Sequence, residues 1–338
     1  MDLRKFGGVP VPLMGAFSDP NDPANVAYNF GVKEEPEAVT TLIRAKAPLY
    51  AQFPNMQGRW DGKASVNHWQ AVLKNYNGDW SKAEELIQYQ PRGTCGGRAG
   101  SFTGDMVQHI LIGTGKRAKF MRTSHAAVYY FARKLYNMIG NGNWQDESDD
   151  GVASGSVPEA LAKMGYANRD EAHDSGWYGP GSDDLACQLA AGMQADLARK
   201  LEEAAKDNLI TAWAPVTSAQ EMADGIAAGG VGIISDSRGY SMTRDSNGYC
   251  RPQGTWYHYH VRAGVLGTDN YPRKGFAYNQ SWSKNTPSGP RLKDYPGNCF
   301  GVDWDVDDAN CRNGRAAVVF GFALWDLERQ NYDIPWTV

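Results

Sequence analysis

The chain lacks the features that would assign it to several common classes of protein. Its 338 residues contain no run of about eighteen apolar residues, the length that a membrane-spanning helix needs. The first residues, MDLRKFGGVP, lack the apolar stretch of a secretory signal. A formal net charge of -4 gives no basic surface for nucleic acid or for an anionic membrane. We therefore expect a cytoplasmic protein with no nucleic-acid partner and no membrane partner.

Cysteine is scarce, and the cysteines are scattered along the chain: Cys95, Cys187, Cys250, Cys299 and Cys311. No two of them have the CxxC spacing of common structural zinc sites. An odd number of separated cysteines predicts mostly free thiols in a reducing compartment, although Cys299 and Cys311 could pair under oxidation. We expect neither a metal nor a cofactor.

Helical patterns fill the first half of the chain and strand patterns the second half. Residues 1–60 are rich in Pro, Asn, Asp and Gly without periodicity, which predicts an extended N-terminal arm. Helices are predicted around 66–88, 124–139, 156–165, 183–206 and 218–229, and strands over 231–235, 255–266, 275–282 and 316–325. This order indicates an α+β protein, in which residues 61–338 form a helical lobe over about 61–230 and a β-rich lobe over about 231–338.

The segment 90–102, QPRGTCGGRAGSF, places a single cysteine at the start of a further predicted helix. The positive end of the helix dipole favours thiolate over thiol, so Cys95 is a candidate nucleophile. Gln90 lies five residues upstream, and its amide can help to bind the negative oxygen that forms when a thiolate attacks a carbonyl. The alternative for an isolated cysteine is a buried structural role.

Two of the six histidines lie in the predicted strand 254–264, GTWYHYHVRAG. The next strand ends in YNQSWS, which carries the amides of Asn279 and Gln280. A thiolate nucleophile needs an imidazole to take its proton, and the imidazole needs a polar side chain to fix its tautomer. His258 and His260 share one face of the strand but stand about 7 Å apart, so only one of them can reach a fixed sulfur.

Together these segments resemble the papain-like cysteine peptidases over roughly residues 88–321. Gln90 and the CGG that begins at Cys95 resemble the family's glutamine and nucleophile segment. The GTWYH that ends at His258, with Gly264 six residues later, resembles the histidine strand, and the QSWS that follows Asn279 resembles the Asn-Ser-Trp-Gly signature. The stretch GYSMTRDSNG, which begins at residue 239, resembles a divergent bacteriophage and bacterial branch.

The resemblance implies a two-lobed papain-like fold and a thiol hydrolase, in the first place a cysteine peptidase with protein or peptide substrates. Cys95 would attack the amide carbonyl, and His258 would act first as base and then as acid. Gln280 or Asn279 would orient the imidazole. Gln90 would form the oxyanion hole together with the backbone N–H of the nucleophile.

Three departures from the family pattern affect the expected chemistry. Gln90 stands one residue closer to the cysteine than in papain, Gly96 replaces the usual aromatic residue, and Gln280 replaces the orienting asparagine. The alternative function is therefore a papain-fold structural or binding component with weak or no catalysis. The phage-like segment and the arm would then indicate a virion-associated protein whose arm contacts neighbouring subunits of the assembly.

Three further features have structural interpretations. The HxH pair of His258 and His260 is an arrangement also found among metal ligands, but the sequence offers no obvious third ligand nearby. The stretch 303–308, DWDVDD, lacks the glycine and the final glutamate of a calcium loop, which predicts a solvated acidic loop. Trp282 is expected to shield the hydrogen bond between the imidazole and its amide from water.

Overall fold

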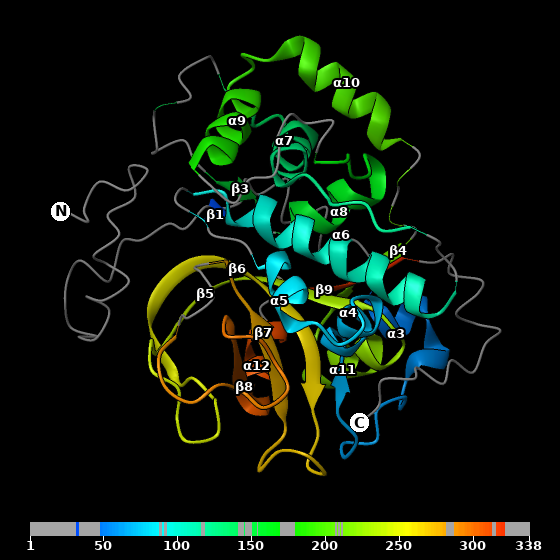
Figure 1. Ribbon diagram of the computed structural model, residues 1–338, viewed down its shortest axis with the longest axis vertical. Helices are drawn as coiled ribbons and strands as arrows, with labels where there is room; N and C mark the ends of the chain where they lie inside the picture. The colour runs from blue at the N-terminus through cyan, green and yellow to red at the C-terminus, as the bar shows by residue number, and fades with distance from the viewer. Residues whose placement is uncertain are drawn as a thin grey trace.

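One long helix, α6 (Cys95–Gly113), lies between a layer of helices and an antiparallel sheet, as the computed structural model in Figure 1 shows. The helical layer contains α7 to α10, and the sheet layer contains β5 to β8 with α12. The structure describes residues 32–33, 48–87, 90, 93–115, 119–140, 145, 151–153, 155–169, 180–206, 208, 210, 212–281, 287–312 and 316–321.

The remaining helices include two that the sequence patterns did not predict, Leu49–Gln52 and Trp304–Arg312. In chain order the remaining helices are α3 (Leu49–Gln52), α4 (Trp69–Asn75), α5 (Trp80–Ala83), α7 (His125–Leu135), α8 (Ser156–Lys163), α9 (Pro180–Ala190), α10 (Ala195–Ala205), α11 (Ala219–Ala227) and α12 (Trp304–Arg312), with 3-10 turns η3 (Pro54–Met56) and η4 (Glu84–Leu86). None of the helices that the structure describes combines the length and the apolar character that crossing a membrane requires.

Local sequence signals set several helix ends. Ser218 caps α11 because its hydroxyl oxygen accepts the backbone N–H of Glu221 at 3.1 Å. The single helix predicted over 183–206 is in fact two helices. The first ends at Ala190, and Gly192 then adopts a left-handed φ of +77°, which stops the helix before α10 begins.

The sheet is antiparallel throughout its seven strands. Its strands are β2 (Val66–Asn67), β4 (Ala212–Val216), β5 (Val231–Tyr240), β6 (Pro252–Leu266), β7 (Gly275–Asn279), β8 (Cys299–Asp303) and β9 (Ala316–Phe320). They follow the order β4-β9-β5-β6-β7-β8, and β2 pairs separately with β6. A second, parallel pair joins β1 (Val32–Lys33) to β3 (Val152–Ala153). Helices in one layer and an antiparallel sheet in the other confirm the α+β class.

Glycines in the first turns of α6 allow neighbouring segments to approach its backbone. A Cβ atom on Gly96 would lie 2.3 Å from the side chain of Val152, and one on Gly97 would lie 2.6 Å from the carbonyl oxygen of His125. Both distances are too short for real carbon contacts, so only glycine fits. Any side chain at position 96, directly after Cys95, would therefore collide with Val152.

Residues 48–60, which composition assigns to the arm, pack on the body of the protein. The hydroxyl of Tyr50 donates to Asp224 on α11, and the backbone N–H of Trp60 donates to the same carboxylate at 2.6 Å. Of the residues before this segment, the structure describes Val32 and Lys33, which form β1. The segment that begins at residue 48 is therefore held by the same core as the two layers.

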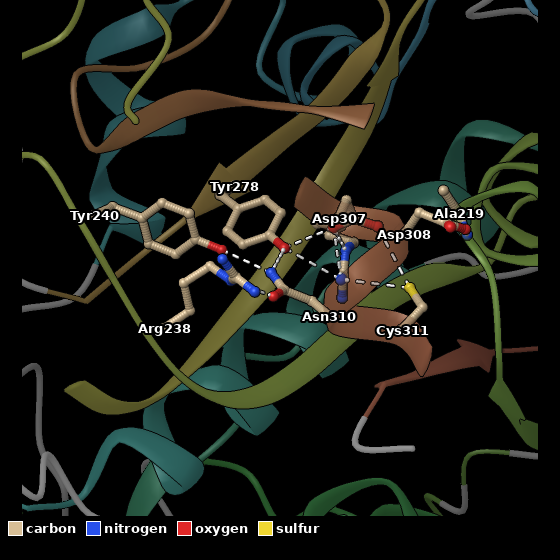
Figure 2. A network of polar contacts seen from close by, with 9 residues as sticks. Ala219, Arg238, Tyr240, Tyr278, Asp307, Asp308, Asn310 and Cys311 are labelled. Carbon is tan, nitrogen blue, oxygen red and sulfur yellow. Dashed lines mark hydrogen bonds and ion pairs between the residues drawn. The ribbon is translucent and has the colours of Figure 1, made fainter. Parts of the chain in front are cut away.

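A buried ion pair joins α12 to the sheet. Arg262 on β6 binds Asp307 on α12 at 2.6 Å, and both side chains are completely buried. The hydroxyl of Tyr278 on β7 donates to the same carboxylate at 2.6 Å, and Asn310 donates to the hydroxyl of Tyr240 on β5 at 2.8 Å. Figure 2 shows how Tyr240 and Tyr278 of the strands meet Asp307 and Asn310 of α12. The network fixes the helix on the inner face of the sheet.

The same network corrects one prediction from composition. The stretch 303–308 is the end of β8 and the start of α12, and it is not a solvated loop. Its aspartate at position 307 is buried because Arg262, 45 residues earlier in the chain, neutralises its charge. Composition alone does not reveal a partner at that separation.

This ion pair leads to a stability prediction. Asp307→Ala leaves the buried guanidinium of Arg262 without its counter-charge, so we expect it to cost about 3–5 kcal/mol of unfolding free energy. Asp308 is the matched control, because it accepts one backbone N–H at 2.9 Å and pairs with the exposed Arg312. Asp308→Ala should cost about 1 kcal/mol. Urea unfolding of both variants measures the difference. Equal losses of unfolding free energy would contradict the larger contribution that we assign to the buried pair of Arg262 and Asp307.

Candidate active site

Cys95 is the first residue of α6 and is completely buried. Three backbone N–H groups near the sulfur, those of Tyr259, Gly96 and Cys95 itself, act to lower the pKa of its thiol. The N–H of Tyr259 belongs to the peptide bond that follows His258. The strand β6 therefore crosses the start of α6 at the histidine that the sequence singles out.

Burial outweighs these N–H groups and raises the pKa of the Cys95 thiol to about 12. The expectation of a lowered thiol pKa, which rests on the helix dipole, is wrong for this arrangement. The dipole and the N–H groups favour the thiolate, but removal of all water around the sulfur disfavours it more. Cys95 is therefore a neutral thiol in this state.

The rings of His258 and His260 lie edge to face, with centroids 4.7 Å apart. Burial lowers the pKa of His258 to about 3, so its imidazole is neutral at pH 7. Burial also holds the pKa of His260 well below its ordinary value. His260 packs among aromatic rings, with the ring of Tyr240 at 5.6 Å and that of Tyr278 at 5.3 Å. The structure thus brings the backbone of His258 to the sulfur and directs its ring toward His260.

Gln90 makes a defined contact across the two layers. The hydroxyl of Ser281, just beyond β7, donates to the side-chain oxygen of Gln90 at 2.7 Å, and both residues are buried. This hydrogen bond fixes which end of the amide faces Ser281. The NH2 group is then the end that remains directed away from it, as a donor for another acceptor.

The side chain of Asn279 is occupied by other partners. Its oxygen accepts a hydrogen bond from Nδ2 of Asn298 at 2.7 Å and one from Sγ of Cys299 at 3.4 Å. An amide oxygen has two lone pairs, so both are in use. Accepting an imidazole N–H would cost one of these hydrogen bonds. Of the two amides considered from sequence, Asn279 is therefore the one whose oxygen already has two donors.

A small cavity lies where α6 packs on the strands. Its lining residues are Arg98, Ala99, Phe102, Tyr259, Val261, Asn279, Gln280 and Ser281. Residues of α6 one turn after the cysteine thus share one space with the amide-bearing segment and with β6. The contact of Ser281 with Gln90 joins Gln90 to this cavity, whereas Cys95 and His258 are not among its lining residues.

The sequence analysis missed a buried ion pair beside the cysteine. Asp183 on α9 binds Arg98 at 3.1 Å, accepts a hydrogen bond from the hydroxyl of Thr94, and lies 3.5 Å from Nε2 of His125. Burial alone would favour the neutral acid, but Arg98 and the hydrogen bonds from His125 and Thr94 hold the pKa of Asp183 below its ordinary value. The available signal was Arg98, a charged residue among the glycines and alanine that begin α6.

Several other predicted features can be located. All five cysteines are free and buried, including Cys299 and Cys311. Within the described residues, no group of three His, Cys, Asp or Glu side chains is arranged to hold a metal ion. Trp282, with its expected shielding role, lies outside the described residues.

Comparison with known proteins gives matches among solved structures, whereas no protein-family model and no curated protein matches the chain. Xylellain, a cysteine protease from Xylella fastidiosa, has a TM-score of 0.51 at 14% identity, over 88% of this chain and 97% of that protein. ProCathepsin B S9 from Trypanosoma congolense has a TM-score of 0.51 at 10% identity, over 87% of each chain. The ragweed pollen cysteine protease Amb a 11, in its proform, has a TM-score of 0.50 at 13% identity, over 90% of this chain and 77% of that one.

These likenesses concern the fold. At such low identities they show that the chain has the mixed helical and antiparallel architecture of the papain-like cysteine proteases. A shared fold does not by itself establish a shared activity. The activity has to be argued from the residues at the junction of α6 and β6.

A carboxyl group opposite His258 leads to a pH prediction. Asp236 on β5 is the register partner of His258, and burial raises the pKa of its carboxyl to about 7. In the unfolded chain the group ionises near pH 3.9, so the unfolded state loses its proton first as the pH rises. Its contribution to stability therefore falls between about pH 4 and pH 7 and is constant above that range.

Asp236→Asn removes this titration. We expect the variant to gain stability relative to the unmodified protein as the pH is raised from about 5 to about 8, by more than about 1 kcal/mol. Urea unfolding at a series of pH values measures the difference. A stability difference that does not change with pH would show that Asp236 has an ordinary pKa in the folded state.

Proposed function

We propose that the chain is a papain-like cysteine peptidase that hydrolyses peptide bonds, with Cys95 as nucleophile and His258 as the acid–base group. The observation that carries the proposal is the position of the peptide bond between His258 and Tyr259, whose N–H acts to lower the pKa of the Cys95 thiol at the start of α6. The fold that the chain shares with cysteine proteases supports the same assignment.

The proposed reaction has two stages. The imidazole of His258 takes the thiol proton of Cys95, and the sulfur attacks the carbonyl carbon of the substrate. The imidazolium then gives its proton to the leaving amine, so that a thioester remains on the sulfur. In the second stage the imidazole takes a proton from water, the resulting hydroxide attacks the thioester, and the thiol and a carboxylic acid are released.

Gln90 is the proposed oxyanion donor together with the backbone N–H of Cys95. Ser281 holds the oxygen of the Gln90 amide, so its NH2 group is oriented before the substrate binds. A donor that is already in place costs no reorganisation when the negative oxygen forms. Gln280 is the proposed acceptor for the imidazole N–H, because the oxygen of Asn279 already has two donors.

The proposed reaction requires a change from the arrangement described above. Cys95 is completely buried, and the ring of His258 contacts His260. His258 shares its face of β6 with His260, whereas Tyr259 and Val261 line the cavity at α6. The backbone of β6 at His258 therefore has to turn before a ring nitrogen can reach the sulfur, and the substrate has to reach Cys95. We propose that the arrangement is a latent form of the enzyme, in which a neutral thiol and a neutral imidazole are kept apart.

Variants at three candidate positions and at one control position test this proposal on a peptide substrate library. Cys95→Ser should abolish hydrolysis, and His258→Ala should lower kcat by about 100-fold or more, because the base is lost. His260→Ala serves as the matched control on the same face of β6. It should lower stability by about 2–4 kcal/mol through a cavity and change kcat by only a few-fold. Gln90→Ala should lower kcat by about 10- to 100-fold with KM little changed.

The second candidate function is a papain-fold component of a phage particle or other assembly with little catalysis. It is favoured by the neutral, buried state of Cys95 and His258. It predicts that Cys95→Ser leaves the biological role of the protein intact. If the unmodified protein hydrolyses peptides no faster than Cys95→Ser does, the result favours this second function over the first.

The position of β1 beside β3 and β6 leads to a further prediction. The strand β1 pairs in parallel with β3, opposite Val152, and also lies against β6. Removal of residues 1–47 takes β1 away and keeps the segment that Asp224 holds. Exposure of the sulfur would lower the pKa of Cys95, so its alkylation by iodoacetamide at pH 7 should become about tenfold faster or more.

Peptide mapping by mass spectrometry provides the readout and the control. The other four cysteines are also buried, so their labelling rates report on general unfolding. Faster labelling confined to Cys95 supports the latent form. An unchanged rate at Cys95, or an equal rise at all five cysteines, would contradict it.

A further inference from the structure

Asn298 holds the end of β7 through a single nitrogen atom. Its Nδ2 donates to the side-chain oxygen of Asn279 at 2.7 Å and to the backbone oxygen of Gln280 at 2.8 Å. Its own side-chain oxygen lies 3.8 Å from the Sγ donor of Cys299. Asn298 is completely buried, so its polar atoms depend on these internal partners.

The two oxygens that accept from Nδ2 of Asn298 belong to consecutive residues, so they restrict rotation of the backbone at Gln280. Asn279 is the last residue of β7, and the carbonyl of Gln280 belongs to the next peptide bond. Asn298 thus holds the side-chain oxygen of Asn279 on one side of Gln280 and the backbone oxygen of Gln280 itself on the other. The backbone dihedrals of Gln280 are therefore constrained. The direction of the Gln280 side chain and the position of Ser281 follow from them.

The effect of this anchor extends to the other layer. Ser281 is the residue whose hydroxyl fixes the amide of Gln90 at 2.7 Å. A shift of the backbone at Gln280 would therefore move both the amide that we propose to orient the imidazole and the hydroxyl that orients the proposed oxyanion donor. Geometric errors of about 1 Å at reacting groups can cost about 100-fold in rate.

We propose that Asn298 is a positioning residue that sets the imidazole-orienting amide of Gln280 and, through Ser281, the oxyanion donor Gln90. The inference rests on the proposed peptidase function and adds a residue that does not touch the substrate. Asn298 also donates to the side-chain oxygen of Asn279, so that this oxygen is less available to accept the imidazole N–H.

The test uses an isosteric substitution in the full-length protein. Asn298→Asp keeps the size of the side chain but replaces the NH2 donor with an oxygen that faces two acceptors. At neutral pH we expect kcat to fall by about 10- to 100-fold, with KM changed by less than about threefold. A buried carboxylate beside two acceptors has a raised pKa, and once protonated it regains one donor. The ratio of variant to unmodified kcat should therefore rise as the pH is lowered from about 8 to about 5.

Asn310→Asp is the matched control. Asn310 is also buried, and its Nδ2 also bridges two acceptors, the hydroxyls of Tyr240 at 2.8 Å and Tyr278 at 3.3 Å. This variant should lose stability without a pH-dependent change in kcat. A double-mutant cycle with Ser281→Ala adds a second readout, because Asn298→Asp should cost less once the hydroxyl is gone.

The outcomes separate the two proposals. A fall in kcat that recovers at low pH in Asn298→Asp, but not in Asn310→Asp, supports the positioning role. Equal kcat values and pH profiles for the two variants, in an active protein, would overturn that role and leave the peptidase assignment intact. If the unmodified protein is no more active than Cys95→Ser, the peptidase assignment fails and the positioning role fails with it.

Discussion

The crossing of α6 over β6 is the contact on which the rest of the site depends. Beside it, Gly96 and Gly97 carry no side chains, which leaves room for Val152 of β3 and for His125 of α7 against the first turn of α6. The N–H of Tyr259 marks the place where α6 and β6 meet. The histidine strand, the amide segment after β7 and Gln90 are positioned relative to this crossing through the register of the sheet and the contact between Ser281 and Gln90.

Burial dominates the electrostatics at this crossing. It raises the pKa of Cys95 and lowers that of His258, so the two groups are neutral, although each has the chemical character of a catalytic partner. Charged groups in the same interior are tolerated where they are paired, as Asp183 is with Arg98 and Asp307 with Arg262. The proposed enzyme is consequently limited by access and side-chain orientation, and its chemistry begins only when water or substrate relieves the burial.

Sequence patterns predicted the parts of this arrangement that depend on neighbours along the chain. Helical and strand periodicities gave the α+β class and the elements around Cys95 and His258. The same reasoning failed where the deciding partner is distant. It gave a low pKa for Cys95 because it could not include burial, and a loop at 303–308 because it could not include Arg262. It left Asn279 and Gln280 as alternatives because it could not include Asn298, 19 residues after Asn279, which donates to the side-chain oxygen of Asn279.

The structure of the protein with a peptidyl aldehyde bound tests the central claim most directly. An aldehyde carbon accepts a thiol reversibly and leaves an oxygen where the oxyanion would form. The account predicts a bond from the Cys95 sulfur to that carbon, a ring nitrogen of His258 turned away from His260 to hydrogen-bond distance of the sulfur or the new oxygen, and the NH2 group of Gln90 on that oxygen. An adduct that forms with the His258 ring still against His260, or no adduct at Cys95 at all, would contradict it.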